Sequence, residues 1–261
     1  MPKFAANLTM LFTELPFMQR FEAAAKAGFE AVEYLFPYPF PKAELAAALK
    51  ANNLKQVLHN LPAGDWDAGE RGIGCHPDRV SEFREGVARA IDYAGTLGCP
   101  QVNCLLGKVP AGVSTQQAHE TAVANLRFAA EQLRGANIRL LIEPINTFDI
   151  PGFFLTRTEQ ALKILDEVDS GNLFVQYDIY HAQRMEGELA STITKNLARI
   201  GHIQLADNPG RGEPGTGEIN YAWLFKHIDA AGYTGWIGCE YKPRGATTAE
   251  GLGWREQLAA R

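Results

Sequence analysis

Four polar side chains lie in segments of the sequence that otherwise have the composition of buried β-strands. An isolated ionised carboxylate in an apolar interior is costly, so it shifts its pKa, pairs with another group or binds a metal ion. The segments "RLLIEPIN", "VQYDIYH", "HIQLAD" and "GCEYKP" carry, in that order, Glu143, Asp178, Gln204 and Glu240. These four positions are the first candidates for a reactive site.

The spacing of the four residues indicates that they meet. Successive members are 26 to 36 residues apart, about the length of one strand-and-helix unit. In a parallel barrel the carboxyl ends of all strands lie at one face, so consecutive units would bring the four side chains together. Three carboxylates so close cannot all stay ionised without a cation, and oxygen ligands suit Mg²⁺ or Mn²⁺ better than Zn²⁺. The sequence therefore predicts a divalent metal site, although each carboxylate taken singly could instead cap a helix or pair with an arginine.

Short apolar segments alternate with longer amphipathic segments along the whole chain. The predicted strands are residues 3–10, 31–36, 55–61, 100–106, 139–146, 173–181, 200–207 and 236–242. The predicted helices are residues 16–28, 42–53, 76–98, 114–135 and 156–168, with weaker ones at 187–199, 221–231 and 247–260. Ser114 is the expected N-cap of one helix, and Thr156 or Thr158 that of the next.

This alternation predicts the fold class. Eight strands, each followed by a helix, are typical of a parallel sheet with crossover helices, and 261 residues suit a closed (β/α)8 TIM barrel. No linker rich in Pro, Gly or Ser divides the chain, so residues 1–261 are expected to form one domain. The alternative, a doubly wound sheet, would need a Gly-rich phosphate turn after the first strand, and "NLTMLFTELPF" contains none.

Composition narrows the class of partner. The net charge is −5 with Lys and Arg scattered along the chain, which argues against nucleic acid or an anionic membrane as partner. The first residues lack the apolar core of a signal peptide, and no segment has the 18 or more apolar residues of a membrane span. The 4 cysteines show no Cys-x-x-Cys spacing and are expected to be reduced, buried thiols of a cytoplasmic protein.

Four further residues are candidates for substrate binding. His181 follows Asp178 by three residues and would leave the barrel beside the site, and His59 lies near the end of a predicted strand. Arg71 and Arg211 lie in the long glycine-rich loops 62–75 and 208–220, where a guanidinium could pair with the carboxylate of a small acid. The alternatives are structural histidines held by hydrogen bonds, and arginines paired with glutamates of their own loops.

Nearly end to end, the sequence resembles the hydroxypyruvate isomerase family of the xylose-isomerase-like barrels. The resemblance lies in the segments "FAANLTMLF", "HNLPAGDWDAGERGIGC", "LIEPINTFDIPGF", "VQYDIYHAQRMEGEL", "ADNPGRGEPGTGEINY" and "GWIGCEYKPRG". It implies that Glu143 and Glu240 are the proton-transferring pair. It also implies that the metal ligands are Glu143, Asp178, Gln204 and Glu240. Many sugar isomerases of the wider superfamily have histidine where this chain has Gln204.

The activity implied by the resemblance is an aldose–ketose type isomerisation. Hydroxypyruvate and tartronate semialdehyde (2-hydroxy-3-oxopropanoate) would interconvert through an enediolate with the help of Mg²⁺ or Mn²⁺, as part of glyoxylate and carbohydrate metabolism. The expected partner is thus a small hydroxy or oxo acid, and a homo-oligomer is left open. Alternatives on the same barrel are a 2-oxo-tetronate isomerase, a sugar 3-epimerase, a metal-dependent phosphodiesterase and a non-catalytic binder of sugars or organic acids.

Overall fold

The structure is a computed structural model that describes residues 2–259. Its eight strands are all parallel and close into a barrel in the order β1 to β8, which confirms the predicted (β/α)8 fold. The strands are β1 (Lys3–Asn7), β2 (Ala31–Glu33), β3 (Lys55–Asn60), β4 (Gln101–Cys104), β5 (Arg139–Ile142), β6 (Leu173–Asp178), β7 (Ile200–Leu205) and β8 (Trp236–Cys239).

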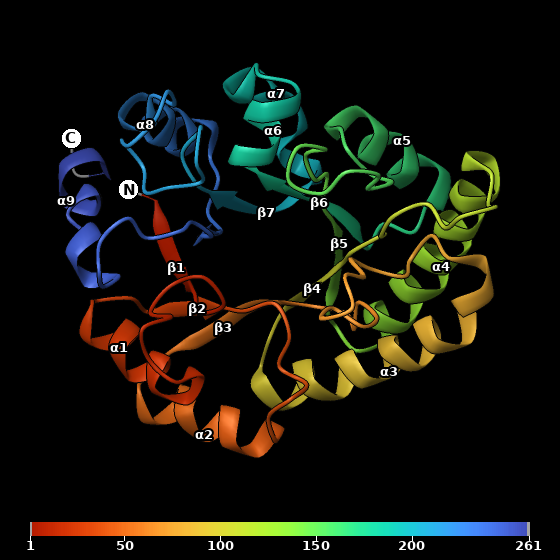
Figure 1. Ribbon diagram of the computed structural model, residues 1–261, viewed down its shortest axis with the longest axis horizontal. Helices are drawn as coiled ribbons and strands as arrows, with labels where there is room; N and C mark the ends of the chain where they lie inside the picture. Colours follow the sequence, from red (N-terminus) through yellow and green to blue (C-terminus); the bar gives the residue numbers. More distant parts are fainter. Residues whose placement is uncertain (1, 260–261) are drawn as a thin grey trace.

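Helices form a ring around the strands (Figure 1). They are α1 (Arg20–Lys26), α2 (Lys42–Ala51), α3 (Val80–Leu97), α4 (Thr115–Gly135), α5 (Thr158–Val168), α6 (Ile179–Met185), α7 (Leu189–Asn196), α8 (Tyr221–Ala231) and α9 (Trp254–Ala259). The last helix packs against the first strand, because Trp254 and Phe4 meet edge to face with ring centroids 5.0 Å apart. Such a pair contributes about 0.5–1.5 kcal/mol beyond the area that it buries.

The N-cap residue predicted for α4 is found in the structure, whereas the one predicted for α5 is not. Oγ of Ser114 accepts a hydrogen bond from the backbone N–H of Gln117 at 3.1 Å, so the predicted cap of α4 is confirmed. The threonine cap predicted for α5 is wrong, because Arg157 is the N-cap residue and its side chain makes no capping bond. The carboxylate of Glu186 instead accepts from the N–H of Thr158 at 2.8 Å, so a distant acid satisfies the helix start.

The sixth strand ends earlier than predicted. The predicted strand 173–181 stops at Asp178, and α6 begins at the next residue. Oδ1 of Asp178 accepts hydrogen bonds from the backbone N–H groups of Tyr180 (2.8 Å) and His181 (3.4 Å). This capping turns β-favouring residues into a helix and leaves the other carboxylate oxygen of Asp178 free for a second role.

Side chains that face the helices form the main apolar core. Val175, Ile203 and Ile237 are fully buried members of it, and each such side chain contributes about 1.5–3 kcal/mol of transfer free energy. Ala5, Ala31 and Val57 form a separate small apolar cluster among the first three strands, with Trp236 packed against it.

Residues that alternate with the outward apolar ones are polar. They are buried as well, and they include Asn7, Glu33, Asn103, Gln176, Asp178, His202 and Gln204. Barrel interiors are usually filled by branched apolar side chains, so this polar lining marks the interior as the place where the chain does its chemistry.

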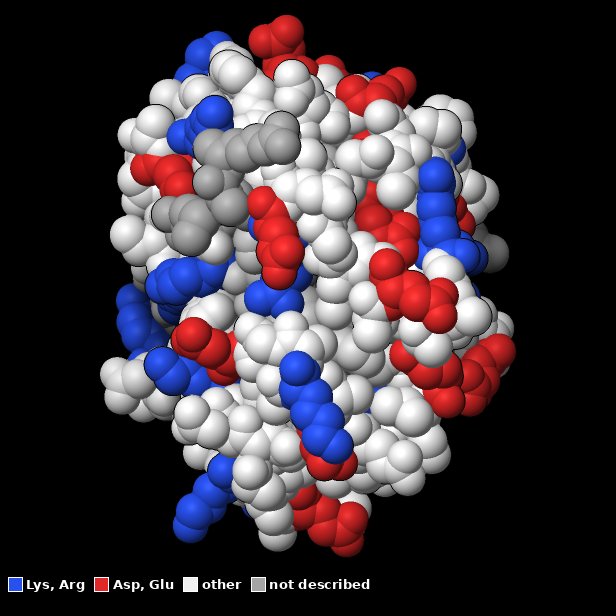
Figure 2. Space-filling model, turned by 90° about the vertical axis from the view of Figure 1, so that its left-hand side faces the viewer, with Lys and Arg blue, Asp and Glu red and all other residues white. Residues whose placement is uncertain are grey.

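Two further expectations concern thiols and membranes. All four cysteines are free and buried, as predicted. Among the helices of residues 2–259, none has the length and apolar character needed to cross a bilayer. Basic and acidic side chains are interspersed on the face shown in Figure 2, and several of opposite sign lie next to each other.

Candidate active site

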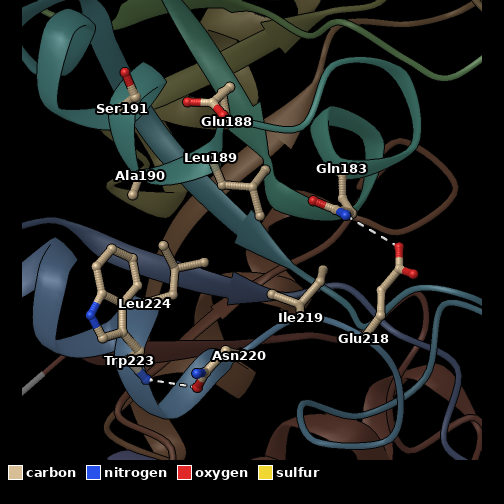
Figure 3. A pocket seen from close by; sticks show the side chains of 10 residues that line it. All are labelled: Gln183, Glu188, Leu189, Ala190, Ser191, Glu218, Ile219, Asn220, Trp223 and Leu224. Carbon is tan, nitrogen blue, oxygen red and sulfur yellow. Dashed lines mark hydrogen bonds between the residues drawn. The ribbon is translucent and has the colours of Figure 1, made fainter.

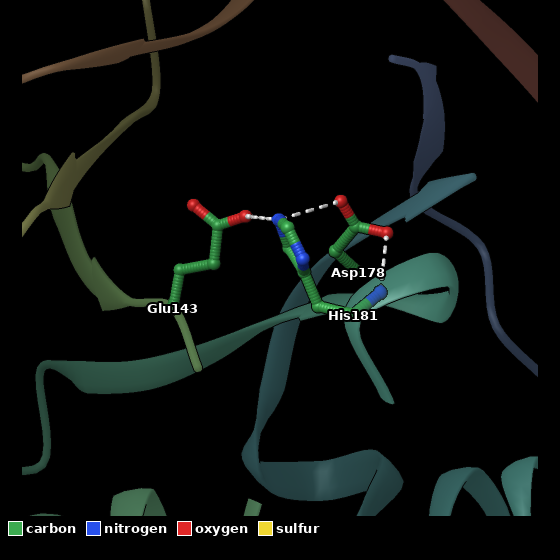
Figure 4. A group of neighbouring side chains, drawn as sticks. All are labelled: Glu143, Asp178 and His181. Carbon is green, nitrogen blue, oxygen red and sulfur yellow. Dashed lines mark hydrogen bonds and ion pairs between the residues drawn. The ribbon is translucent and has the colours of Figure 1, made fainter. Parts of the chain in front are cut away.

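Glu143, Asp178 and His181 converge at the carboxyl ends of β5 and β6 (Figure 4). Nε2 of His181 lies 3.8 Å from Oε1 of Glu143 and 3.6 Å from Oδ2 of Asp178. One ligand atom from each of the three residues falls within 4.8 Å of the others, and all three side chains are buried. Two strands and the start of α6 thus place two acids and an imidazole around one small volume.

The unpartnered oxygen of Asp178 indicates a cation at this place. Oδ1 caps α6, whereas Oδ2 is buried without a hydrogen-bond partner, and the nearest charged or donor groups, Nη2 of Arg211 and Nε2 of His181, each lie 3.6 Å from it. A buried anionic oxygen left in this state costs free energy unless a cation or a donor meets it. Burial also raises the pKa of Asp178. The residues present therefore fit a divalent metal ion.

Glu143 follows directly on the last residue of β5 and is fixed by the neighbouring strand. Nδ2 of Asn103, on β4, donates a hydrogen bond to Oε2 of Glu143 at 3.0 Å, which leaves Oε1 directed toward His181. The pKa of Glu143 is raised well above its ordinary value, first by burial and then by the charges of Glu240 and Asp178. Buried acids with a raised pKa are common among groups that transfer protons in active sites.

Glu240 directly follows the last residue of β8, just as Glu143 directly follows the last residue of β5. Burial raises its pKa to about 8, and the positive charge of Arg211 opposes part of that shift. The residue is 6% exposed, the same as Glu143, so both acids are shielded from bulk water.

Arg211 extends from the loop after β7 into the group of acids. Its Nη2 lies 3.3 Å from Oε2 of Glu240 and 3.6 Å from Oδ2 of Asp178. The guanidinium also lies over the ring of Tyr180, 5.2 Å from the centroid. The structure thus brings Arg211 to the predicted site, and it contacts two of the four predicted metal ligands.

The tautomer of His181 follows from its neighbours. The backbone N–H and Nδ2 of Asn146 both face Nδ1 of His181, at 3.4 and 2.6 Å. The amide of Asn146 is itself oriented, because its oxygen accepts from the N–H groups of Phe148 and Asp149. Nδ1 is therefore assigned as the acceptor, and Nε2 carries the proton that points toward Glu143 and Asp178. Burial lowers the pKa of His181 well below its ordinary value, so the ring is a neutral donor.

Gln204 lies beside Asp178 in the sheet, because the two residues are register partners of β7 and β6. Its side chain is buried. Oε1 accepts a hydrogen bond from Nε2 of Gln176 at 2.6 Å, and Nε2 donates to Oε1 of Glu33 at 2.7 Å. The residue thus stands in the polar interior next to the acids, and its role as a metal ligand stays a prediction.

The placement of His59 in the site is wrong. Val32 pairs with Gln56 and Glu33 pairs with Leu58, so Val57 is an extra residue of a β-bulge. An extra residue reverses which side chains face inward after it, and His59 faces the helices. Its Nδ1 lies 3.1 Å from Nε2 of Gln56, its ring packs against Tyr38, and burial lowers its pKa to about 3.

Arg71 is held within its own loop. Its Nη1 donates to the backbone oxygens of Trp66 (2.9 Å) and Glu70 (2.6 Å), and its guanidinium stacks 4.2 Å from the Trp66 ring centroid. The carboxylate of Glu70 pairs with Arg79 instead. These contacts hold the guanidinium of Arg71 within its own loop, and its role in substrate binding stays a prediction.

Three residues next to the predicted set were not expected from the sequence. They are Asn103, which holds Glu143, Asp149, which lies 3.9 Å from Arg211, and Glu33, which binds Gln204. Glu33 carried a usable signal, because it is a carboxylate inside the strand-like segment "AVEYLF". Asn103 and Asp149 carried no such signal, since a neutral asparagine in a strand and an aspartate in a loop are both common in proteins.

Apart from this group of residues, a hollow of about 320 Å³ lies on the outside of the barrel, between α6, α7 and α8 (Figure 3). Nε2 of Gln183 donates across it to Glu218 at 3.2 Å, and Trp223 at its rim is 53% exposed. Its lining is Gln183, Glu188, Leu189, Ala190, Ser191, Glu218, Ile219, Asn220, Trp223 and Leu224. Its lining includes two carboxylates, Glu188 and Glu218, but no histidine or cysteine, and the nearby His227 stacks on Trp223 instead, so the hollow lacks the chemistry of the barrel mouth.

Comparison with known families agrees with this geometry. The family model described as "Xylose isomerase-like TIM barrel" matches residues 21–258. The chain belongs to the xylose isomerase-like TIM barrel family. The resemblance found in the sequence is thereby confirmed at the level of the family.

Several xylose isomerase-like barrels are similar to this chain over almost their whole length. A hydroxypyruvate isomerase of Escherichia coli K12 is 60% identical over 98% of this chain and 99% of its own. A 2-oxo-tetronate isomerase of Cupriavidus necator is 48% identical over 100% of both chains. A crystal structure from Brucella melitensis, described as an AP endonuclease of family 2, is 44% identical with a TM-score of 0.96, covering 98% of this chain and 99% of its own.

Proposed function

We propose that this protein is a hydroxypyruvate isomerase, which interconverts hydroxypyruvate and 2-hydroxy-3-oxopropanoate. The observation that carries the proposal is the 60% identity with a hydroxypyruvate isomerase over nearly the full length of both chains. The pair of buried glutamates at the ends of β5 and β8 supports it, since an aldose–ketose shift moves a proton between neighbouring carbons.

The two glutamates are proposed as the proton-transferring groups. One of them removes a proton from C3 of hydroxypyruvate, the enediolate forms, and a proton returns at C2. The pKa of Glu240, raised to about 8, suits this task, because a group that both accepts and returns a proton works best with a pKa near the working pH.

The neighbouring residues are proposed to bind the substrate. The Nε2–H of His181 points into the space between Glu143 and Asp178, where it would donate to a substrate oxygen. The guanidinium of Arg211 would pair with the carboxylate of the hydroxy or oxo acid, because a planar fork of donors matches a carboxylate. No nucleic acid or membrane is needed as a partner.

A divalent cation, Mg²⁺ or Mn²⁺, is proposed as the cofactor. The residues that would hold it are Glu143, Asp178, Gln204 and Glu240, all oxygen ligands. When bound, such an ion acts as a Lewis acid that polarises a carbonyl oxygen and stabilises developing negative charge. The unpartnered Oδ2 of Asp178 is the feature of the structure that most favours it.

Proton NMR in D₂O tests the proposal directly. The protein, with Mg²⁺ or Mn²⁺, is incubated in parallel with hydroxypyruvate, a 2-oxo-tetronate and a ketohexose. We expect conversion of hydroxypyruvate with uptake of solvent deuterium at carbon. Absence of both conversion and deuterium uptake with every substrate would rule out an isomerase and leave a non-catalytic binder.

A second candidate is a 2-oxo-tetronate isomerase, which the 48% identity with the Cupriavidus necator enzyme favours. The same experiment separates the two, because the preferred substrate is the one with the higher kcat/KM. A duplex that contains an abasic site is added as a further arm. We expect no cleavage of it, since the chain carries a net charge of −5 and a phosphate backbone needs a basic surface.

A further inference from the structure

Glu33 is a fully buried carboxylate inside the barrel that the proposed chemistry does not use. Three side chains surround it. Its Oε1 accepts hydrogen bonds from Nδ2 of Asn7 at 3.0 Å and from Nε2 of Gln204 at 2.7 Å. Its Oε2 lies 2.6 Å from Nε2 of His202. Both oxygens of Glu33 are therefore engaged by side chains from β1 and β7.

The eighth strand leaves room for this carboxylate. An ideal Cβ placed on Gly238 would lie 2.3 Å from each oxygen of Glu33, closer than any real contact allows. Gly238 is also the register partner of Gln204, so the space is beside the predicted ligand. A glycine at this position lets Glu33 reach across the interior of the barrel.

The contact with Glu33 decides which end of the Gln204 amide faces which neighbour. An ionised carboxylate only accepts hydrogen bonds, so it requires the NH₂ end of the amide. Nε2 of Gln176 donates to the oxygen end at 2.6 Å, which agrees with that orientation. A half-turn of the amide would set its oxygen against the carboxylate of Glu33, and that contact would be lost. Gln176 could turn with it, because its own Oε1 has no partner, so the contact with Glu33 is the one that fixes the orientation.

We propose that Glu33 is a positioning residue for the metal site, which acts by holding the amide of Gln204 so that its oxygen is available to a divalent cation. This rests on the proposed function, because it takes Gln204 as a ligand. Partners of this kind commonly affect metal affinity by about 10–100-fold. Substitution of Glu33 could also change the metal affinity in two other ways. It could remove a negative charge near the metal, or it could disturb the packing of the barrel interior.

Two substitutions separate orientation from charge. Glu33→Gln keeps an acceptor oxygen for Asn7 and Gln204, and its NH₂ would face Nε2 of His202, but it removes the charge. Glu33→Asp keeps the charge, but its shorter side chain withdraws the acceptor from Gln204. Positioning and charge therefore predict opposite orders of affinity.

The experiment measures Mn²⁺ affinity by titration calorimetry on the metal-stripped full chain, together with a thermal melt of each variant. The proteins are wild type, Glu33→Gln, Glu33→Asp, Gln204→Ala, the double variant E33D/Q204A, and Asn7→Ala as the control that removes the other amide on the same oxygen. We expect Glu33→Gln and Asn7→Ala to stay within about threefold of wild type. Glu33→Asp should lose about 10–100-fold, and it should lose nothing further once Gln204 is alanine.

Three results would overturn the inference. They are a loss in Glu33→Gln as large as that in Glu33→Asp, an undiminished effect of Glu33→Asp in the Gln204→Ala background, and wild-type protein that binds no Mn²⁺. The proposed function is judged separately, by turnover of hydroxypyruvate on the same preparations. Mn²⁺ binding with the expected order of affinities but without turnover would end the proposed function and support the positioning role of Glu33.

Discussion

Nη2 of Arg211 lies 3.3 Å from Oε2 of Glu240. The same nitrogen lies 3.6 Å from Oδ2 of Asp178, the oxygen that has no hydrogen-bond partner. A guanidinium thus stands between two acids that are predicted to share a metal ion. Its charge offsets part of their repulsion. Its Nε donates to the backbone oxygen of Glu240 at 3.3 Å, so Nη1, which lies 3.9 Å from Oδ2 of Asp149, is the nitrogen left to meet an anionic substrate.

Substitution of Arg211 should weaken substrate binding. Because a hydrogen bond to a charged group contributes about 1.5–3 kcal/mol, we expect Arg211→Gln to raise KM for hydroxypyruvate by roughly 10- to 100-fold. Arg71→Gln is the matched control, since Arg71 is satisfied by its own loop, and it should change KM by less than about threefold. Steady-state kinetics of both variants check this, and a larger effect at Arg71 would reverse the assignment.

Substitution of Glu240 should affect turnover more than binding. A positioned acid or base contributes about 10²–10⁴-fold, so Glu240→Gln should lower kcat by that range with a small change in KM. Glu22→Gln, on the exposed surface of α1, is the control for a lost glutamate elsewhere. A Glu240→Gln enzyme with the wild-type kcat would exclude Glu240 from proton transfer.

The metal-free protein should become less stable as the pH rises from about 5 to 8. The pKa of Glu240 is raised to about 8 in the folded state, above the value of about 4.3 expected in the unfolded chain. A group with a raised folded-state pKa stabilises the fold below its unfolded pKa, and that stabilisation is lost as the pH rises through the folded-state pKa.

Thermal melts of metal-stripped protein at several pH values measure this slope. In Glu240→Gln the fall in melting temperature should be shallower, because one of the titrating groups is gone. Metal binding near pH 7 should release protons for the same reason, and calorimetry in buffers of different ionisation enthalpy detects them. A flat stability profile for the metal-free wild type would contradict the raised pKa values.

His59 and His181 should behave in opposite ways. His59 packs against Tyr38 on the side of β3 that faces the helices. His59→Gln should therefore lower the free energy of unfolding by about 1–3 kcal/mol and leave kcat/KM nearly unchanged. His181→Gln should leave stability closer to wild type and lower kcat/KM by tenfold or more, because a donor to the substrate is lost, roughly 1.4 kcal/mol. Urea unfolding and steady-state kinetics together test the pair, and a large kinetic effect at His59 would return it to the site.

The sequence predicted the fold because the period of apolar and amphipathic segments is visible in every unit. It predicted that Glu143, Asp178 and Glu240 lie at the carboxyl ends of strands, because a carboxylate is conspicuous in a strand-like segment. It failed for His59 because the bulge at Val57 is set by how β2 and β3 pair, and no local pattern announces it. The helix after Asp178 was missed because "IYH" favours strands, and only the capping carboxylate overrides that preference.

The contacts of Gln204 show a further limit of sequence reasoning. Its position in a late strand was visible, but its partner Glu33 lies 171 residues away in an early strand. Contacts across a closed barrel join residues that no spacing rule relates. The orientation of the amide could therefore come only from the three-dimensional arrangement.

The central claim is that a divalent cation, gathered by buried acids at the carboxyl ends of the strands, is needed for isomerisation. The most direct test follows hydroxypyruvate by proton NMR in D₂O with protein stripped of metal by exhaustive chelation, before and after stepwise addition of Mn²⁺ or Mg²⁺. The account predicts that conversion and deuterium uptake disappear on stripping and return as the metal is added. Undiminished turnover by protein shown to contain no metal would contradict it.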